Sequence, residues 1–217
     1  MKNQFLLLML FLAVGCARTP DANYLPINLA DDTLAPWDAP VYTESELLAM
    51  FPDADYSGLV SVYVATNGSD ESGDGSVSNP YRSIQQAVRQ HTNAGTIIRV
   101  KAGTYTNNFW VNVFGTKDAP YVIVSDDGAG AAVIDGQWAD ETLVGLKGQY
   151  IVFDGFEVKN TLDYAVGVFH YEEYEKGGTD NYTVVRNCHL HHAGRDVLKA
   201  AHADFLLFES NDIHHST

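Results

Sequence analysis

The second half of the chain repeats a short pattern, and this repeat limits the possible folds more than any other feature. Three segments align without gaps: residues 151–158, 183–190 and 206–213. Each reads apolar–x–apolar, two turn residues, apolar–x–apolar. Since side chains alternate between the two faces of a strand, the pattern predicts two short strands joined by a tight bend, with both apolar sets on one side. Such units bury their apolar faces by stacking on one another.

A third strand completes each repeat. Residues 143–146, 165–168 and 197–200 align with one another at the same offsets, and we align residues 110–113 as an earlier copy. Equivalent positions in the last two repeats lie 23 residues apart, and the preceding repeat carries an insertion near 171–181. Three strands in about 23 residues predict an all-β fold, a right-handed parallel β-helix.

The bend between the first two strands of each repeat is occupied by Gly155, Asn187 or Ser210. Glycine and asparagine adopt positive φ at low cost, so we expect left-handed backbone at least at the first two positions. The chain stops directly after the second strand of a repeat, with no element to cover the last apolar face. We therefore expect this β-helix to be truncated at its C-terminus.

The charge balance bears on possible partners. Thirteen Lys and Arg face 28 Asp and Glu, a formal net charge of −15. Phosphate backbones are bound by clusters of Lys and Arg, which are missing from this sequence, so we expect no nucleic-acid partner. An acidic chain would also repel an anionic polysaccharide unless cations intervene. We expect a monomer.

The N-terminus has the pattern of an export signal. One lysine precedes an apolar run that is too short to span a membrane comfortably and ends in small residues before Cys16. Residues 13–16 resemble a bacterial lipobox, so we interpret 1–16 as a lipoprotein signal peptide, with lipid on Cys16. An ordinary cleaved signal is the alternative. The expected location is the outer membrane or cell surface, on its periplasmic or extracellular face, with this lipid anchor as the membrane contact. Only Cys188 then remains, which leaves no disulfide.

Two regions precede the coils. Residues 17–60 are rich in Pro and Asp without sustained periodicity, and we interpret them as a tether. Within it, Thr43 and Glu46 form a capping-box pattern for a short helix. Residues 61–217 are assigned to the β-helix, with an N-terminal cap over 61–95 and coils over 96–217. In that cap, the spacing of apolar residues predicts a helix whose buried face closes the end of the β-helix; they are Tyr81, Ile84, Ala87 and Val88.

The cap also carries a family resemblance. Its sequence resembles the N-terminal cap and first coil of pectate-lyase-like β-helix proteins, most closely polysaccharide lyase family nine and uncharacterised β-helix lipoproteins; the segments are 63–70, 73–76, 79–81, 83–87 and 100–105. The likeness covers about 61–217. It implies a polysaccharide lyase that acts by β-elimination on a uronic-acid polymer such as pectate. In these lyases a basic side chain removes the proton α to a uronate carboxylate, and calcium held by Asp residues neutralises that carboxylate.

Alternation along the third strand identifies the side chains that face outward. If Val144, Val166 and Leu198 point into the core, the outward lane contains Asn112, Gly145, Gly167 and Lys199. Parallel strands stack about 4.8 Å apart. The two glycines would thus leave a shallow groove beside one amine, which we expect to bind substrate. We add His202, which aligns with His170, to the candidate substrate-binding residues.

The resemblance assigns roles to residues beside this groove. Lys199 is the match for the catalytic base, and a solvated surface lysine is the alternative. Arg195 precedes the same strand and could clamp a substrate carboxylate, or form a salt bridge with Asp196 or a neighbouring turn. For calcium, oxygen ligands from adjacent turns should converge, and the candidates are Asp163, Asp196 and Asp135. A compact acidic cluster is missing from residues 159–163, a departure from the lyase pattern.

Two other functions fit the same residues. A β-helix glycoside hydrolase would need two carboxylates flanking the sugar, for which Asp163 with Asp196 or Glu172 are available. A non-catalytic carbohydrate-binding or surface protein would need no special groove residue.

Aromatic and histidine side chains offer further interpretations. Trp110, Trp138, Phe169 and Tyr171 could stack against sugars beside the groove, with ordinary packing as the alternative. Histidines 191–192 align with histidines 214–215, near enough for two imidazoles to share a transition metal. Stacking of like residues at repeated corners explains these pairs more simply.

Overall fold

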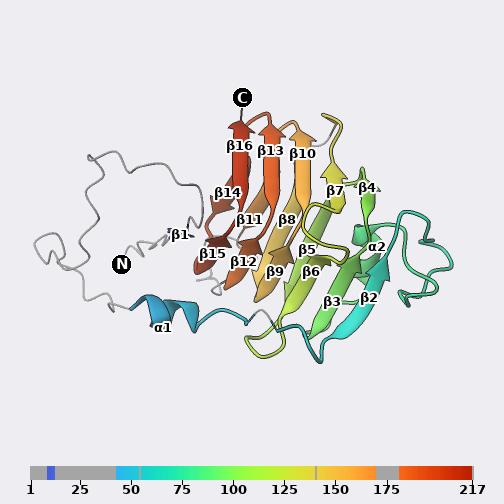
Figure 1. The fold of residues 1–217 in the computed structure, drawn as a ribbon, viewed down its shortest axis with the longest axis horizontal. Coiled ribbons are helices and arrows are strands. Elements are labelled where there is room, and N and C mark those ends of the chain that lie inside the picture. Colours follow the sequence, from blue (N-terminus) through green and yellow to red (C-terminus); the bar gives the residue numbers. More distant parts are fainter. Residues whose placement is uncertain (1–8, 13–42, 54, 140, 170–180, 217) are drawn as a thin grey trace, which may run out of the picture.

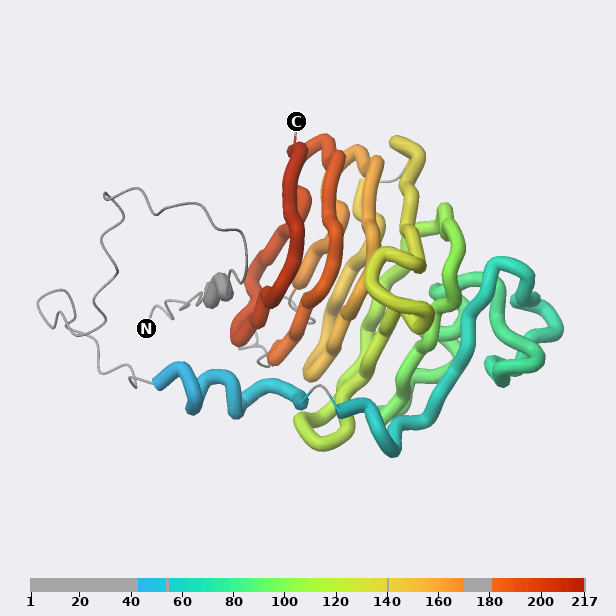
Figure 2. Tube along the Cα trace, viewed as in Figure 1, coloured from blue at the N-terminus to red at the C-terminus, as the bar shows by residue number. Residues whose placement is uncertain are grey.

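The computed structural model describes residues 9–12, 43–53, 55–139, 141–169 and 181–216, the first of these ranges by its backbone alone. Its named strands form three sheets, and every pairing between them is parallel. Successive coils stack in sequence order from β2 to β16 (Figures 1 and 2). Each complete coil contributes one strand to each sheet, so the predicted parallel β-helix with three strands per turn is confirmed.

The strands follow one another across each sheet in a fixed order. Sheet 1 contains β1 (Met9–Leu12), β15 (Leu206–Glu209), β12 (Thr183–Arg186), β9 (Ile151–Asp154), β6 (Tyr121–Ser125), β3 (Thr96–Val100) and β2 (Val60–Val64). Sheet 2 contains β16 (Asp212–Ser216), β13 (His189–Ala193), β10 (Glu157–Thr161), β7 (Ala132–Asp135) and β4 (Gly103–Tyr105). Sheet 3 contains β14 (Leu198–Ala201), β11 (Tyr164–Phe169), β8 (Thr142–Gln149) and β5 (Phe109–Phe114).

The core lies between the three sheets and is filled by the residues that alternation points inward. Val144 and Val166 are fully buried, and Leu198 packs against the same core. Phe153 and Phe156, on either side of a bend, stack at 4.4 Å between ring centroids. The bends have the predicted left-handed backbone, with φ of 82° at Gly155 and 53° at both Asn187 and Ser210. Ser210 shows that the geometry of the corner outweighs the preference of its residue.

The N-terminal end of the β-helix is closed by α2 (Ile84–Gln90). Ile84, Ala87 and Val88 are buried on its inner face, as the spacing predicts. Tyr81 is buried as well, but the prediction that it belongs to this helix is wrong, because Tyr81 precedes the helix and pairs with Val64 in an isolated bridge. The Ser83 side chain caps the helix by accepting from the Gln86 amide. No helix in the described part of the chain is long and apolar enough to cross a membrane.

Part of the segment interpreted as a tether packs on the outer face of sheet 1. It begins with α1 (Glu44–Leu48), whose predicted capping box between Thr43 and Glu46 is present. Phe51 is 8% exposed and joins an apolar cluster with the outward side chains of sheet 1. Its ring meets Tyr182 edge-on at 6.2 Å. Over 50–53 and 55–59, therefore, the chain forms a strap that packs on the outer face of sheet 1.

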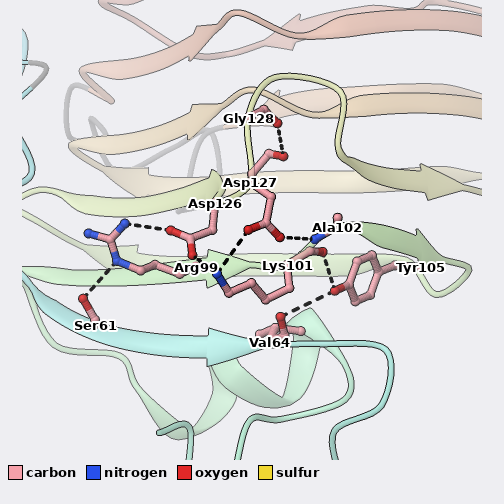
Figure 3. Close-up of polar contacts among 10 residues, drawn as sticks. Ser61, Val64, Arg99, Lys101, Ala102, Tyr105, Asp126, Asp127 and Gly128 are labelled. Atoms are coloured by element: carbon pink, nitrogen blue, oxygen red, sulfur yellow. Dashed lines mark hydrogen bonds and ion pairs between the residues drawn. The ribbon is translucent and has the colours of Figure 1, made fainter. Parts of the chain in front are cut away.

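Polar side chains occupy the outer face of sheet 1 nearer the cap (Figure 3). Asp126 accepts from Arg99 Nη1 at 2.9 Å and from Lys101 Nζ at 2.6 Å. Asp127 accepts from Lys101 Nζ at 3.2 Å and from the Ala102 amide at 2.7 Å. Burial opposes ionisation of Asp126, but Lys101 and Arg99 outweigh it and hold the pKa of this carboxyl below its ordinary value of 3.8.

This network predicts a pH-dependent contribution to stability. A carboxyl with a lowered pKa stabilises the folded state above its unfolded pKa, and this contribution is lost as the pH falls through the folded value. We expect Asp126→Asn to reduce the free energy of unfolding by about 1–2 kcal/mol at pH 7. The difference between variant and wild type should shrink below pH 3.8. Urea unfolding at several pH values measures it, and a difference that stays constant down to pH 2 would refute the assignment.

Candidate functional site

The outer face of sheet 3 carries the predicted groove, but its composition differs from the prediction. Gly145, Gly167 and Lys199 do lie side by side on β8, β11 and β14. On β5, however, the neighbour of Gly145 is Trp110, and Asn112 pairs with Lys147. The predicted alignment of 110–113 is thus wrong by two residues. Because that shift preserves the alternation of faces, the hydrophobic pattern could not reveal it.

Aromatic rings pack directly against the two glycines, so the glycines do not leave the open groove that the sequence predicted. A Cβ atom on Gly145 would lie 2.1 Å from Cε3 of Trp110, and one on Gly167 would lie 2.2 Å from Cε2 of Phe169. Any larger residue at either position would push a ring off the sheet. The Trp110 and Phe169 rings lie 5.6 Å apart at an interplanar angle of 31°. Together they form a partly exposed apolar surface, and two of the four proposed sugar-stacking residues thus come together.

A lysine that the sequence analysis did not select completes this surface. Lys147 Nζ lies 4.6 Å from the centroid of the Trp110 ring and 5.9 Å from that of Phe169. Within the described ranges, no carboxylate lies within ion-pair distance of Lys147. The residue could have been found, because Lys147 follows Gly145 by two positions and therefore faces the same way.

The other two cations surround Tyr164, at the start of β11. Lys199 Nζ lies 5.7 Å from the centroid of the Tyr164 ring, and the Arg195 guanidinium carbon lies 5.4 Å from it. Tyr164 in turn lies 6.3 Å from Phe169. We call this set the aromatic–cationic strip: Trp110, Lys147, Tyr164, Phe169, Arg195 and Lys199. It brings three cations together on one face of a chain whose formal net charge is −15, with Asp163 and Asp196 beside two of them.

Each predicted calcium ligand already has a partner. Asp163 forms an ion pair with Arg195 at 3.6 Å, and Asp196 forms one with Lys199 at 3.3 Å. Of the two salt bridges considered for Arg195, the structure has the one to the neighbouring turn. Asp135 is the last residue of β7, in sheet 2, and accepts from Asn160 Nδ2 at 3.0 Å.

These three carboxylates do not assemble a calcium site by themselves. In the described part of the chain, the groups of three potential ligands within mutual reach all contain histidines on sheet 2, and none contains Asp163, Asp196 or Asp135. Calcium takes six to eight oxygen ligands. The described residues therefore do not fit a preformed calcium site on sheet 3.

The remaining candidates fall at the margin of the strip or outside the described ranges. His202 directly follows β14 and is exposed. Trp138 is exposed in the turn after β7 and does not belong to the strip. Cys188 is buried, and burial raises the pKa of its thiol to about 12. Three other candidates lie outside the described residues; they are Cys16, Tyr171 and Glu172.

Comparison with known proteins agrees with this fold. The family described as "Pel9A-like, right handed beta helix region" matches residues 62–215. The chain belongs to this family. Among solved structures, a rhamnogalacturonan lyase aligns with a TM-score of 0.50 and 16% identity, covering 63% of this chain and 37% of that protein. The pectate lyase Pel9A aligns with a TM-score of 0.51 and 22% identity, covering 72% of this chain and 39% of that protein.

Membership in the Pel9A-like family confirms the resemblance predicted from the cap and establishes the right-handed parallel β-helix. The chain spans less than half the length of the two lyases that it resembles. No curated protein matches the sequence. At these identities the two structures are evidence for the fold, and the chemistry has to be argued from this chain's own residues.

Proposed function

We propose that the aromatic–cationic strip binds a uronic-acid polysaccharide and that the chain acts on it as a polysaccharide lyase. One observation carries the binding part: Lys147, with no carboxylate partner among the described residues, lies over Trp110 beside Phe169. Sugar rings stack their apolar faces on aromatic rings, and a uronate adds a carboxylate that suits a nearby cation. A neutral polysaccharide would leave Lys147 without a counter-charge, whereas Arg195 and Lys199 already pair with Asp163 and Asp196.

The reaction part rests on the position of Lys199 in the same strip. In β-elimination, a base removes the proton α to the uronate carboxylate. The electrons of that C–H bond form a C=C bond, and the glycosidic C–O bond at the β-carbon breaks, so the leaving oxygen departs with the other half of the chain and takes a proton. Lys199, as the neutral amine, is the candidate base, and the ammonium that it becomes can return the proton to the leaving oxygen. Arg195 is the candidate ligand for the carboxylate. Both now pair with Asp residues, so substrate binding must draw them away.

Calcium is common in lyases of this class, and it supplies positive charge beside the substrate carboxylate. The described residues do not form a site for it without substrate, so the proposed step uses side chains alone. Comparing activity in added calcium with activity in a chelator tests this separately.

Trp110→Ala tests the proposed binding surface. We expect this change to weaken binding of oligogalacturonates by about tenfold, since it removes an aromatic face for stacking and the ring over which the Lys147 ammonium lies. Trp138→Ala is the matched control, because Trp138 is exposed outside the strip. Isothermal titration with fragments of pectate, alginate and glycosaminoglycan, and with neutral oligosaccharides, measures the affinities.

The outcomes of that titration separate the functions considered. Binding that Trp138→Ala weakens as much as Trp110→Ala would contradict the assigned surface. Binding without release of unsaturated ends, which absorb in the ultraviolet, would indicate a carbohydrate-binding module instead of a lyase. Preference for neutral oligosaccharides would contradict the role of the cations.

A further inference from the structure

Five histidines gather on the outer face of sheet 2, on the last two strands of that sheet. They are His189, His191, His192, His214 and His215, and Glu157 and Asp212 lie among them. This face belongs to a different sheet from the aromatic–cationic strip, and the proposed function does not use it. The register explains the gathering: His189 pairs with Asp212, and His191 pairs with His214, on adjacent coils.

We propose that His189, Asp212 and His214 form a binding site for a divalent transition metal of the zinc class. Their ligand atoms approach one another from two strands. His189 Nε2 lies 2.7 Å from His214 Nε2 and 3.7 Å from Asp212 Oδ2, and His214 Nε2 lies 4.0 Å from the same oxygen. Tetrahedral zinc with bonds of 2.0–2.2 Å holds its ligand atoms roughly 3.3–3.5 Å apart. The three separations lie on either side of that value, so small side-chain rotations satisfy it.

The second ring nitrogen of His214 is also engaged. His214 Nδ1 contacts His215 Nδ1, which turns Nε2 of His214 toward His189. Metal-binding histidines usually have their other nitrogen held in this way, because the contact fixes the tautomer and the ring orientation. Two imidazoles and one carboxylate are donors that zinc, cobalt and nickel accept, whereas calcium prefers oxygen alone.

A second triad shares His189 but is less suited to a metal. It consists of Glu157, His189 and His191. Lys159 Nζ lies 2.6 Å from Glu157 Oε1, so an ammonium group already neutralises this carboxylate. Asp212, in contrast, has no Lys or Arg partner among the described residues, and its side chain is 73% exposed. A metal ion from solvent can therefore reach the Asp212 site without displacing a cation.

The site joins β13 to β16, the last two coils described. A metal bound there would link side chains across two strands, and binding to the folded state alone raises its stability. The inferred role is that of a clip on the C-terminal coils. It is independent of the polysaccharide activity proposed for sheet 3.

The test is titration of the untagged chain with ZnCl₂ by calorimetry, and with Co²⁺ by visible absorption, which reports tetrahedral coordination. We expect saturable binding of one equivalent. His189→Gln, His214→Gln and Asp212→Asn should each weaken it by at least about tenfold. His202→Gln, a histidine outside the cluster, and Glu157→Gln should leave it unchanged.

Three results would overturn the proposal. The first is the absence of saturable binding by wild type. The second is an equal loss with His202→Gln, which would indicate unspecific binding. The third is a loss with Glu157→Gln but not with Asp212→Asn, which would place the metal at the other triad. Because all these residues lie on a solvent-exposed face, circular dichroism should show each variant folded like wild type.

Discussion

Replacing Lys199 by alanine is expected to lower the rate of unsaturated-end formation on pectate by about 10² to 10⁴-fold, the usual contribution of a positioned general base. The side chain is an outward lysine on β14, in register with Gly167 and beside Tyr164. Without its amine, no other lysine or arginine of the strip occupies that place in the register. The measurement is ultraviolet absorbance at saturating substrate, with wild type and variant matched for folded protein.

Two other lysine variants test whether the loss of activity is specific to Lys199. Lys117→Ala removes an exposed lysine from the turn between β5 and β6 and should leave the rate unchanged. Lys147→Ala should raise KM more than it lowers kcat, because its amine lies over the aromatic rings and contributes to binding. If Lys199→Ala retains full activity, another group is the base. If all variants and wild type are inactive but bind pectate, the strip is a binding surface.

The repeats predicted the fold well because every coil places the same local requirements on its residues. Inward positions such as Val144 and Val166 must be apolar in every coil, and corners such as Gly155 and Asn187 must allow positive φ. Both requirements recur at a fixed spacing. Sequence alone therefore identified the strands of the coils from residue 143 onward and the helix that closes the end.

The candidate site was harder to predict because its outward positions obey no such rule. Shifting β5 by two residues keeps every inward side chain buried, so the alternation accepted Asn112 where the structure places Trp110. Exchanging those two residues turns an open groove into an aromatic surface. The ion pairs of Asp163 and Asp196 depend on turn geometry, which a periodic pattern does not encode. Lys147 could have been identified from the alternation of strand faces alone, but the sequence analysis did not select it.

The strap across sheet 1 was also not predicted, because its contacts join residues far apart in the chain. Tyr56 donates to Asp154 at 2.7 Å, although 98 positions separate the two residues. Asp154 also accepts from Arg186 Nε and from Asn187 Nδ2, both at 2.9 Å. Arg186 contacts the Tyr56 hydroxyl as well. Pro and Asp in the strap indicated only irregular backbone, whereas the strap contacts this buried charged group through Tyr56.

Removing one member of that group should have the largest effect on stability. Asp154 and Arg186 are only 8% and 9% exposed. Asp154→Leu would leave the Arg186 guanidinium buried without its counter-charge, and we expect a loss of about 3–5 kcal/mol in the free energy of unfolding. Urea denaturation followed by circular dichroism measures this loss.

The double variant Asp154→Leu/Arg186→Met discriminates between loss of the charge pair and loss of packing. Replacing both members of a buried ion pair by apolar residues of similar volume is often close to neutral, so the double variant should recover most of the stability lost in Asp154→Leu. Recovery would show that the single variant is destabilised by an unpaired buried charge beneath the strap. If the double variant is as unstable as Asp154→Leu, the pair instead holds Tyr56, and with it the strap, against sheet 1. A loss below about 1 kcal/mol in Asp154→Leu itself, as for an exposed ion pair, would mean that water reaches Arg186 and that the strap does not seal this face.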